Sequence, residues 1–185
     1  YHGESMLIAY RTDAVELISL ENIWLSPTPH VAGSTFGGDQ SGCPRLFVHA
    51  ELSVEGGEGT IHWINTHLDH KGKESRKRGL DVIIEMLPKI NPKGLPMVTI
   101  GDFNAQYKAE ALDRVKKEWK DARVQAKSSD DKYSFNGFGK SWNGTVDYIW
   151  YKGFKRCHDY KVIVRKYDHV PFISDHYPIR ADLEF

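Results

Sequence analysis

The sequence predicts an α+β fold in which two mixed β-sheets pack as a sandwich. Strand-like runs recur along the chain, whereas only two segments have the periodicity of a helix. No internal repeat or linker divides the sequence, and 185 residues are enough to bury a sizeable core. We therefore assign residues 1–185 to a single domain.

Seven runs have the composition of strands. The last, residues 179–185, alternates best, because Ile179, Ala181 and Leu183 face one way and charged residues face the other. Residues 97–101 predict a short buried strand that ends at a glycine turn. The remaining strand runs are 6–11, 15–20, 46–53, 60–67 and 146–151.

Two helices are predicted, over 74–90 and 108–119. Apolar residues in the first follow the spacing of one helix face, and residues 91–94 end it. The apolar residues are Leu80, Ile83, Ile84 and Leu87 in the first helix and Ala111, Leu112, Val115 and Trp119 in the second. Long loops are expected at 26–45, 123–145 and 165–175, and the last two flank candidate catalytic residues.

The composition excludes several classes of protein. No apolar run reaches the roughly 18–20 residues of a membrane span, so we expect a soluble protein without one. Lys and Arg together number 25, as do Asp and Glu, and this balance argues against binding to DNA through bulk positive charge. Cys43 and Cys157 are too few for a zinc finger, and the sequence leaves open whether they form a disulfide.

The chain begins at Tyr1 without an initiator Met or a signal-peptide pattern. We interpret this as an internal starting point, with the N-terminal part of the domain and any targeting region missing. The compartment therefore stays open.

The first candidate catalytic residue is His67, in the motif Asn65-Thr66-His67-Leu68-Asp69-His70. This motif closes a predicted strand, where a side chain can reach a cleft and transfer protons near neutral pH. A histidine that is hydrogen-bonded in the core is the alternative. Zinc binding by His67 and His70 would need a third ligand, which this segment does not supply.

The motif Gly101-Asp102-Phe103-Asn104 follows a buried strand directly. It delivers a carboxylate and a carboxamide to the edge of a sheet. Asp102 can hold a metal, a water or an imidazole, and Asn104 can donate to a phosphate oxygen. The alternative is an Asx turn after a strand.

Asp147 lies in an apolar strand, where a carboxylate is costly unless it is paired. Ser174-Asp175-His176 precedes the final strand, so we expect Asp147 to orient His176 as a base that takes a proton from water. Asp175 would point another way and could face a metal. A water-facing edge strand and a polar turn are the alternatives.

Two further segments can bind a ligand. Residues 71–78 hold five basic residues and one acid at the start of a predicted helix, where a bound anion would use free N–H groups. A solvated helix face is the alternative. The aromatic loop 133–138, together with Trp142, can stack on a sugar or a base, or can simply pack within the loop.

Taken together, the motifs resemble the endonuclease/exonuclease/phosphatase superfamily, which includes deoxyribonuclease I, exonuclease III and the inositol polyphosphate 5-phosphatases. The resemblance rests on four motifs in this order, at 65–68, 101–104, 145–149 and 174–176. It extends from Glu4 to Phe185. It implies a four-layer α/β/β/α sandwich of two packed mixed sheets (DNase I-like), here lacking its first strands.

The resemblance also implies roles for individual residues. His67 corresponds to a general acid that Glu4 orients. Asp102 and Asn104 correspond to the pair that positions the nucleophilic water and the phosphate. Asp147 and His176 correspond to the Asp–His pair. Which histidine is the base and which the acid stays open, because the mechanism is argued differently across the superfamily.

The remaining implied roles concern phosphate and metal. Arg45 and Arg76 resemble arginines that contact the substrate phosphate, together with Asn104. Asp175 resembles the aspartate on the metal side. The glutamate that is the principal Mg²⁺ ligand of the family has no counterpart, because the sequence begins after it. The expected cofactor is Mg²⁺, with Mn²⁺ as an alternative.

The resemblance implies a Mg²⁺-dependent phosphoric ester hydrolase. We expect a phosphomonoester or phosphodiester substrate, a small sugar or nucleotide phosphate above all, since the balanced charge disfavours a processive DNA binder. Residues 23–34 resemble the bacterial branch of the superfamily, which includes hydrolases of unknown substrate. A DNase I-like nuclease that acts on nucleic acid is the first alternative, and strong salt sensitivity would be its sign. A non-catalytic binding module is the second. No obligate protein partner is inferred.

Overall fold

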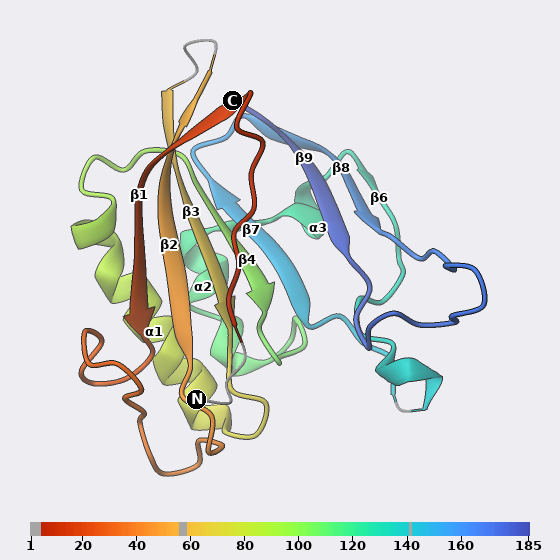
Figure 1. Ribbon diagram of the computed structural model, residues 1–185, viewed down its shortest axis with the longest axis horizontal. Helices are drawn as coiled ribbons and strands as arrows, with labels where there is room; N and C mark the ends of the chain where they lie inside the picture. The colour runs from red at the N-terminus through yellow and green to blue at the C-terminus, as the bar shows by residue number, and fades with distance from the viewer. Residues whose placement is uncertain (1–4, 56–58, 141) are drawn as a thin grey trace.

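The computed structural model describes residues 5–55, 59–140 and 142–185 (Figure 1). The longer strands are β1 (Val15–Trp24), β2 (Leu46–Val54), β3 (Gly59–His67), β4 (Met97–Asp102), β7 (Asp147–Lys152), β8 (Arg156–Val162) and β9 (Ile179–Glu184). Two-residue strands are β5 (Lys120–Asp121) and β6 (Ser128–Ser129). The helices are α1 (Lys73–Ile90), α2 (Val115–Glu118) and α3 (Ala122–Gln125), with 3₁₀ turns at Glu110–Leu112 and Gly137–Gly139.

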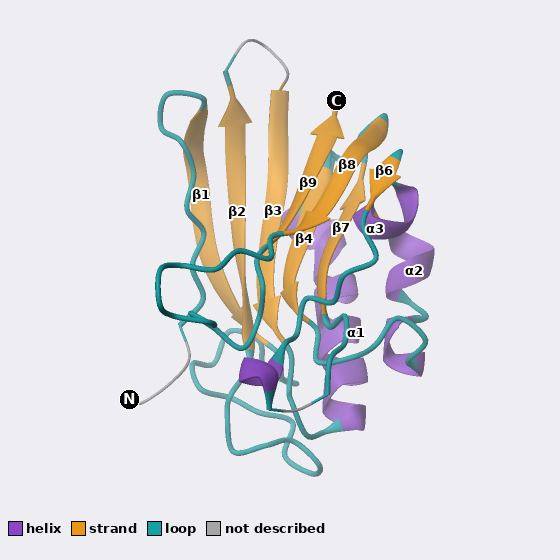
Figure 2. Ribbon diagram, turned by 90° about the vertical axis from the view of Figure 1, so that its right-hand side faces the viewer, coloured by secondary structure: helices purple, strands orange, loops and turns teal. Residues whose placement is uncertain are grey.

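The strands form two sheets, as predicted. The larger sheet has the order β1-β2-β3-β4-β7-β5 and the smaller the order β6-β8-β9. Both are mixed, because β3 and β4 are parallel in the first, β6 and β8 are parallel in the second, and the other pairs are antiparallel. Helices α1 and α2 lie on one face of the large sheet, and the small sheet lies against the other (Figure 2). Among the described residues, the outer face of the small sheet carries no helix longer than one turn, so three of the four expected layers are seen.

Side chains that alternate between the two faces of the large sheet form two separate hydrophobic clusters. On β3, Ile64 joins the cluster under α1, whereas its neighbour Trp63 packs with the cluster between the sheets. The predicted face of α1 lies on the large sheet, with Leu80, Ile83, Ile84 and Leu87 buried. Both cysteines are free, Cys157 buried and Cys43 exposed. None of the helices in the described ranges has the length and apolar character needed to cross a membrane.

The start of α1 differs from the prediction of an anion site. Asp39, from the preceding long loop, accepts hydrogen bonds from the backbone N–H groups of Glu74 (2.9 Å) and Ser75 (3.1 Å). The carboxylate of Asp39 therefore satisfies N–H groups that a bound anion would have used. The expectation of an anion on free N–H groups at this helix end is wrong.

Several predicted elements also differ. Residues 6–11 form no strand. Leu7 O accepts a hydrogen bond from Asn65 Nδ2 (2.8 Å), and Arg11 O accepts one from Val15 N (2.9 Å) in the turn before β1. The predicted helix 108–119 is a 3₁₀ turn followed by the single turn α2. Arg114, between the two, reaches back to Asp81 on α1 (2.7 Å), so tertiary contacts determine this segment. Gly101 lies within β4 and does not end it.

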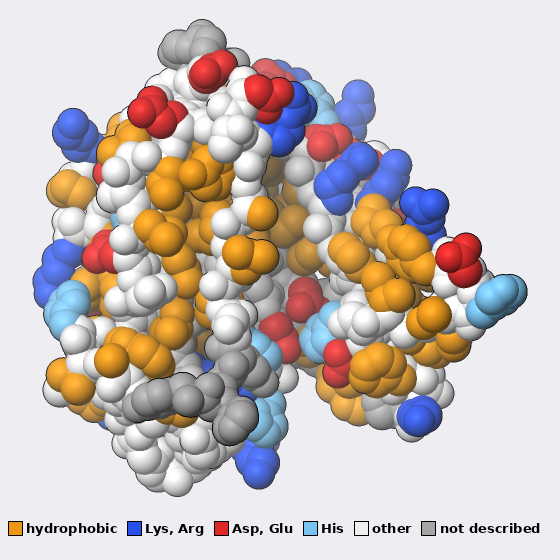
Figure 3. Space-filling model, in the orientation of Figure 1, with side chains coloured by type: hydrophobic (Ala, Val, Ile, Leu, Met, Phe, Trp, Pro, Cys, Tyr) orange, Lys and Arg blue, Asp and Glu red, His pale blue; other side chains and the backbone are white. Residues whose placement is uncertain are grey.

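A cleft of about 560 Å³ opens between parts of the two sheets. Its walls are mainly apolar and include Trp63, Val98 and Leu183. Acidic and histidine side chains gather at the foot of the hollow in Figure 3. The arrangement of the sheets thus opens a path from solvent to the ends of the central strands.

Asp121 is expected to limit the stability of this fold above pH 6. It is 5% exposed and accepts a hydrogen bond from Arg123 N (2.8 Å) at the start of α3. Burial raises the pKa of Asp121 to about 6, although the Arg123 N–H and the Arg123 charge oppose this shift. The folded state therefore holds this proton more tightly than the unfolded chain, whose Asp pKa is about 4. The contribution is complete below about pH 4 and is lost as the pH rises through about 6.

The substitution Asp121→Asn keeps the acceptor oxygen and removes the buried charge. We expect it to raise the free energy of unfolding at pH 8 by about 2 kcal/mol and to flatten the stability profile between about pH 4 and 6. Urea unfolding at pH 4.5 and pH 8 measures both effects. A variant that is less stable than the parent at pH 8 would contradict the expectation.

Candidate active site

Neighbouring strand ends bring the predicted site residues together. In the register of the large sheet, His67 on β3 pairs with Asp102 on β4, and Asp102 pairs with Asp147 on β7. These three side chains therefore occupy one row across the sheet, and His176 reaches the row from the turn before β9. A pocket of about 460 Å³ opens over them. Its lining consists of Arg45, His67, His70, Asp102, Asn104, Phe135, Asp147, Ser174, Asp175 and His176.

The predicted contact between Asp147 and His176 is present. His176 Nδ1 lies 2.7 Å from Asp147 Oδ2, which fixes the ring and directs Nε2 towards Asp102 Oδ2, at 3.8 Å. Burial opposes the charged form of His176. The hydrogen bond to Asp147 and the charges of Asp147, Asp102 and Asp175 together outweigh it, so the pKa of His176 is raised.

Asp102 lies between the two histidines. Its Oδ2 is 3.3 Å from His67 Nε2 on one side and 3.8 Å from His176 Nε2 on the other. The other oxygen, Oδ1, accepts a hydrogen bond from Asn104 N (2.7 Å). The Asx turn considered as an alternative is therefore formed, and the same carboxylate faces the pocket.

Asn104 is held in a left-handed conformation, with φ of 47°. Its Nδ2 donates to Leu68 O at 3.0 Å, which ties the segment after β4 to the segment after β3. One amide hydrogen is used there, and the side chain still lines the pocket.

The two predicted arginines lie in different places. Arg45 is buried, lines the pocket and lies 3.1 Å (Nη2) from His70 Nδ1. Arg76 does not line this pocket; its Nη1 donates to Asp69 O (2.9 Å) beside a neighbouring one. The predicted residue Glu4 lies outside the described residues.

Asp69 holds two segments together, a role that no sequence pattern predicts. Its buried carboxylate accepts hydrogen bonds from the N–H and hydroxyl of Ser41 and from the N–H groups of Lys71 (2.9 Å) and Gly72 (2.7 Å). It thereby joins the long loop before β2 to the start of α1. The only signal in the sequence was its place in the motif between His67 and His70.

Substituting Asp69 tests this junction. Burial raises the pKa of Asp69, but the hydrogen bonds from Ser41, Gly72 and Lys71 together lower it to about 2. The contribution to stability is therefore present above about pH 4 and is lost as the pH falls towards 2. We expect Asp69→Asn to lower the free energy of unfolding at pH 7 by about 2–3 kcal/mol, with a smaller effect at pH 3. Urea unfolding at both pH values measures this.

The exposed Asp113→Asn is the control for Asp69→Asn and should change the free energy of unfolding by under about 1 kcal/mol. Equal losses for the two variants would refute the role of Asp69.

A divalent cation fits the donors of the pocket. Asp102, Asp147 and His176 form a group whose ligand atoms all lie within 4.8 Å of one another. His176 Nδ1 is already bonded to Asp147, so oxygen donors such as Asp102 and Asp175 suit an added ion better. Mg²⁺ prefers one or two carboxylates and retains several waters. The zinc alternative gains no support, since His67 and His70 belong to no three-ligand group in the part of the chain that is described.

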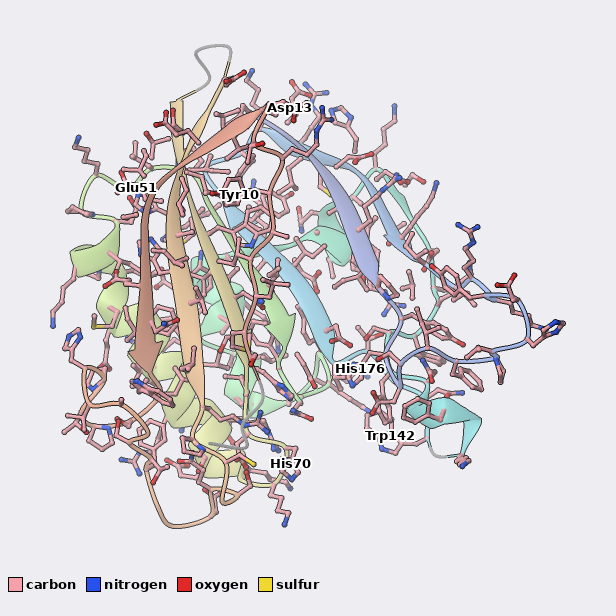
Figure 4. All side chains as sticks on the ribbon, in the orientation of Figure 1. Tyr10, Asp13, Glu51, His70, Trp142 and His176 are labelled. Carbon is pink, nitrogen blue, oxygen red and sulfur yellow. The ribbon has the colours of Figure 1, made fainter. Side chains whose placement is uncertain are left out.

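The aromatic loop contacts the same pocket. The Phe135 ring lies 5.0 Å from the His176 ring, edge to face, and 4.9 Å from the Trp142 ring. Trp142 is 53% exposed and lies close to His176 at the lower end of the cleft (Figure 4). The packing alternative is present, since Phe135 packs on both His176 and Trp142. Stacking of this loop on a sugar or a base stays a prediction.

No protein-family model matches the chain, and no curated protein does either. Solved structures do resemble it. A conserved protein of unknown function from Enterococcus faecalis is 27% identical, with a TM-score of 0.82, over 94% of this chain and 68% of the other. An endonuclease/exonuclease/phosphatase from Bacteroides vulgatus is 26% identical, with a TM-score of 0.83, over 95% and 68%. A mannosyl-6-phosphatase from Bacteroides thetaiotaomicron is 25% identical, with a TM-score of 0.85, over 95% and 69%.

Proposed function

Since the chain belongs to the endonuclease/exonuclease/phosphatase superfamily, we propose that it hydrolyses a small phosphoric ester, a sugar or nucleotide phosphate, with water as the nucleophile. One observation carries this proposal. The carboxylate of Asp102 lies between two imidazole Nε2 atoms, and Asp147 fixes one of the two rings. Hydrolysis of a phosphoester needs one proton removed from water and one given to the leaving oxygen, and two histidines on opposite sides of one carboxylate can divide this work.

We assign the base to His176. With Nδ1–H donating to Asp147, the neutral ring presents an unprotonated Nε2 towards Asp102 and the pocket. A water held near Asp102 can transfer its proton to this Nε2 as it attacks phosphorus. Asp147 then stabilises the positive charge that forms on the imidazole ring.

His67, on the other side of Asp102, is assigned as the acid that protonates the leaving oxygen. Asn104 and Arg45 border the same pocket and can donate to the phosphoryl oxygens, where negative charge increases in the transition state. Asp175 and Asp102 would hold Mg²⁺, which when bound neutralises part of this charge.

The substrate class rests on two observations. The mannosyl-6-phosphatase of the same fold acts on a phosphorylated sugar, and the open ring of Trp142 suits stacking on a sugar or a base. The nuclease alternative loses part of its support, because two of the five cations of the basic run, Lys77 and Arg78, already contact other side chains. Lys77 lies 3.6 Å from Glu110, and the Arg78 guanidinium lies 4.3 Å from the centroid of the Phe36 ring.

The test measures turnover with Mg²⁺ or with EDTA, on a panel of sugar phosphates, nucleotides and supercoiled plasmid. The proposal expects metal-dependent release of phosphate from a small ester and an intact plasmid. Trp142→Ala should raise KM for that ester, whereas Tyr133→Ala, an exposed aromatic of the same loop, should not. Nicking of the plasmid without turnover of small esters would make the protein a nuclease. Binding of these esters without turnover of any substrate would favour the binding module.

A further inference from the structure

A second pocket adjoins the candidate active site on the side of α1. Its volume is about 390 Å³, and it lies between the first two turns of α1 and the segment that follows β4. Asn104 lines both pockets, so the two spaces meet at this side chain. Small side chains, Ala105, Ala109 and Ala111, leave the second pocket open.

Three cations of α1 line this second pocket. Lys73, Arg76 and Lys77 lie on one face of the helix because residues three and four apart share a side. Two carboxylates also line it. Glu110 lies 3.6 Å from Lys77, and Glu74 is exposed. Lys73 has no ion pair with any described residue, so the cations exceed the carboxylates around this space.

Arg76 is held in place for binding. Its Nη1 donates to Asp69 O, and the Asp69 side chain is itself fixed by three backbone N–H groups and a hydroxyl. The other N–H groups of this guanidinium have no partner among the described residues. They therefore remain available to an oxygen acceptor in the pocket.

Among the described residues, Lys73 makes no ion pair that would explain a cation at the start of α1, whereas Arg76 and Lys77 each have one structural contact. Asp39 already satisfies the N–H groups of Glu74 and Ser75, and cations near a helix N-terminus oppose the macrodipole. Residues that lower local helix stability in this way are expected at functional sites. Here they surround an open pocket beside the position proposed for a phosphate.

We propose that this pocket is a subsite for a second phosphate group of the substrate. The scissile phosphate would lie in the first pocket, and Lys73 and Arg76 would bind the second phosphate on the far side of Asn104. The substrate class is then a sugar or nucleotide bisphosphate. This inference rests on the proposed function, because it needs the first pocket to hold the phosphate that is hydrolysed.

The test compares each monophosphate with its bisphosphate in the full chain with Mg²⁺. The pairs are glucose 6-phosphate with glucose 1,6-bisphosphate, and AMP with adenosine 3′,5′-bisphosphate. In one pair at least, we expect kcat/KM to be about tenfold higher for the bisphosphate, since charge-assisted hydrogen bonds are strong. Lys73→Met should lower kcat/KM for the bisphosphate about three- to tenfold and change kcat/KM for the monophosphate by less than about twofold. Lys73→Arg should restore kcat/KM for the bisphosphate. Lys71→Met, an exposed lysine that lines neither pocket, is the control and should change neither.

Equal effects of Lys73→Met on both members of a pair, or no effect on either, overturn the subsite. If Lys73→Met lowers the rate of hydrolysis only for a single-stranded oligonucleotide, the assignment to a small substrate is overturned. Calorimetry with the His176→Ala variant separates this inference from the proposed function. Bisphosphate binding that weakens in the His176→Ala, Lys73→Met double variant supports the subsite even without turnover. Bisphosphate turnover that Lys73→Met does not change overturns the subsite but still supports the proposed function.

Discussion

Replacing His176 with alanine is expected to lower kcat about 10²–10⁴-fold and to leave the chain folded. The imidazole is the group best placed to take a proton from water, and it is partly exposed, so its removal leaves no large internal cavity. The measurement is kcat for the best small ester, with thermal unfolding as the check on folding. His158→Ala, which removes an exposed histidine paired with Glu184, is the matched control and should keep full activity. Turnover unaffected by His176→Ala would refute the assignment of the base.

The contact with Asp147 determines the titration of His176. The pKa of His176 is raised, because the hydrogen bond to Asp147 and nearby negative charges outweigh the effect of burial. In the protein without metal, NMR titration of the His176 ring should therefore give a pKa above the ordinary histidine value of about 6.5. Asp147→Asn removes the main partner that raises this pKa and leaves the effect of burial, so the titration should move to lower pH. A titration that stays in place would show that Asp147 does not control this pKa.

Replacing Gly101 with alanine is expected to destabilise the protein by about 3 kcal/mol or more. Gly101 has φ of 139°, and a Cβ built there would lie 1.8 Å from Thr66 O on the neighbouring strand. Because β3 and β4 pair at this point, the strands would have to separate next to His67 and Asp102. Urea unfolding measures the loss, and activity should fall with it.

Gly94→Ala is the control for Gly101→Ala. Gly94 also has a positive φ, of 64°, but an added Cβ meets nothing within 4 Å. Its expected cost is therefore only that of the backbone conformation, about 1 kcal/mol. Equal losses at the two positions would show that the close approach to Thr66 does not matter.

The sequence predicts those parts of the fold that local pattern determines. Alternation and helical spacing locate the long strands and α1, and each motif at the end of a strand marks a residue of the pocket. β8 was missed because a bulge between Cys157 and Asp159 interrupts its alternation. The cap on α1 was missed because Asp39 lies 35 residues before the Glu74 N–H that it satisfies. Contacts between distant segments leave no local pattern.

The row formed by His67, Asp102 and Asp147 links activity to correct strand pairing. A slip of one residue between β3 and β4, or between β4 and β7, would turn alternate side chains to the opposite face of the sheet. A chain that collapsed with such a slip could be compact and rich in sheet, yet it would carry no assembled row. Recovered turnover after dilution from denaturant therefore counts only the molecules whose central strands are aligned, and a spectroscopic signal would count the misaligned ones as well. Insertions and deletions of one residue within these strands should accordingly abolish activity, whereas the loop before β2 can change in length wherever Asp39, Ser41 and Arg45 keep their contacts.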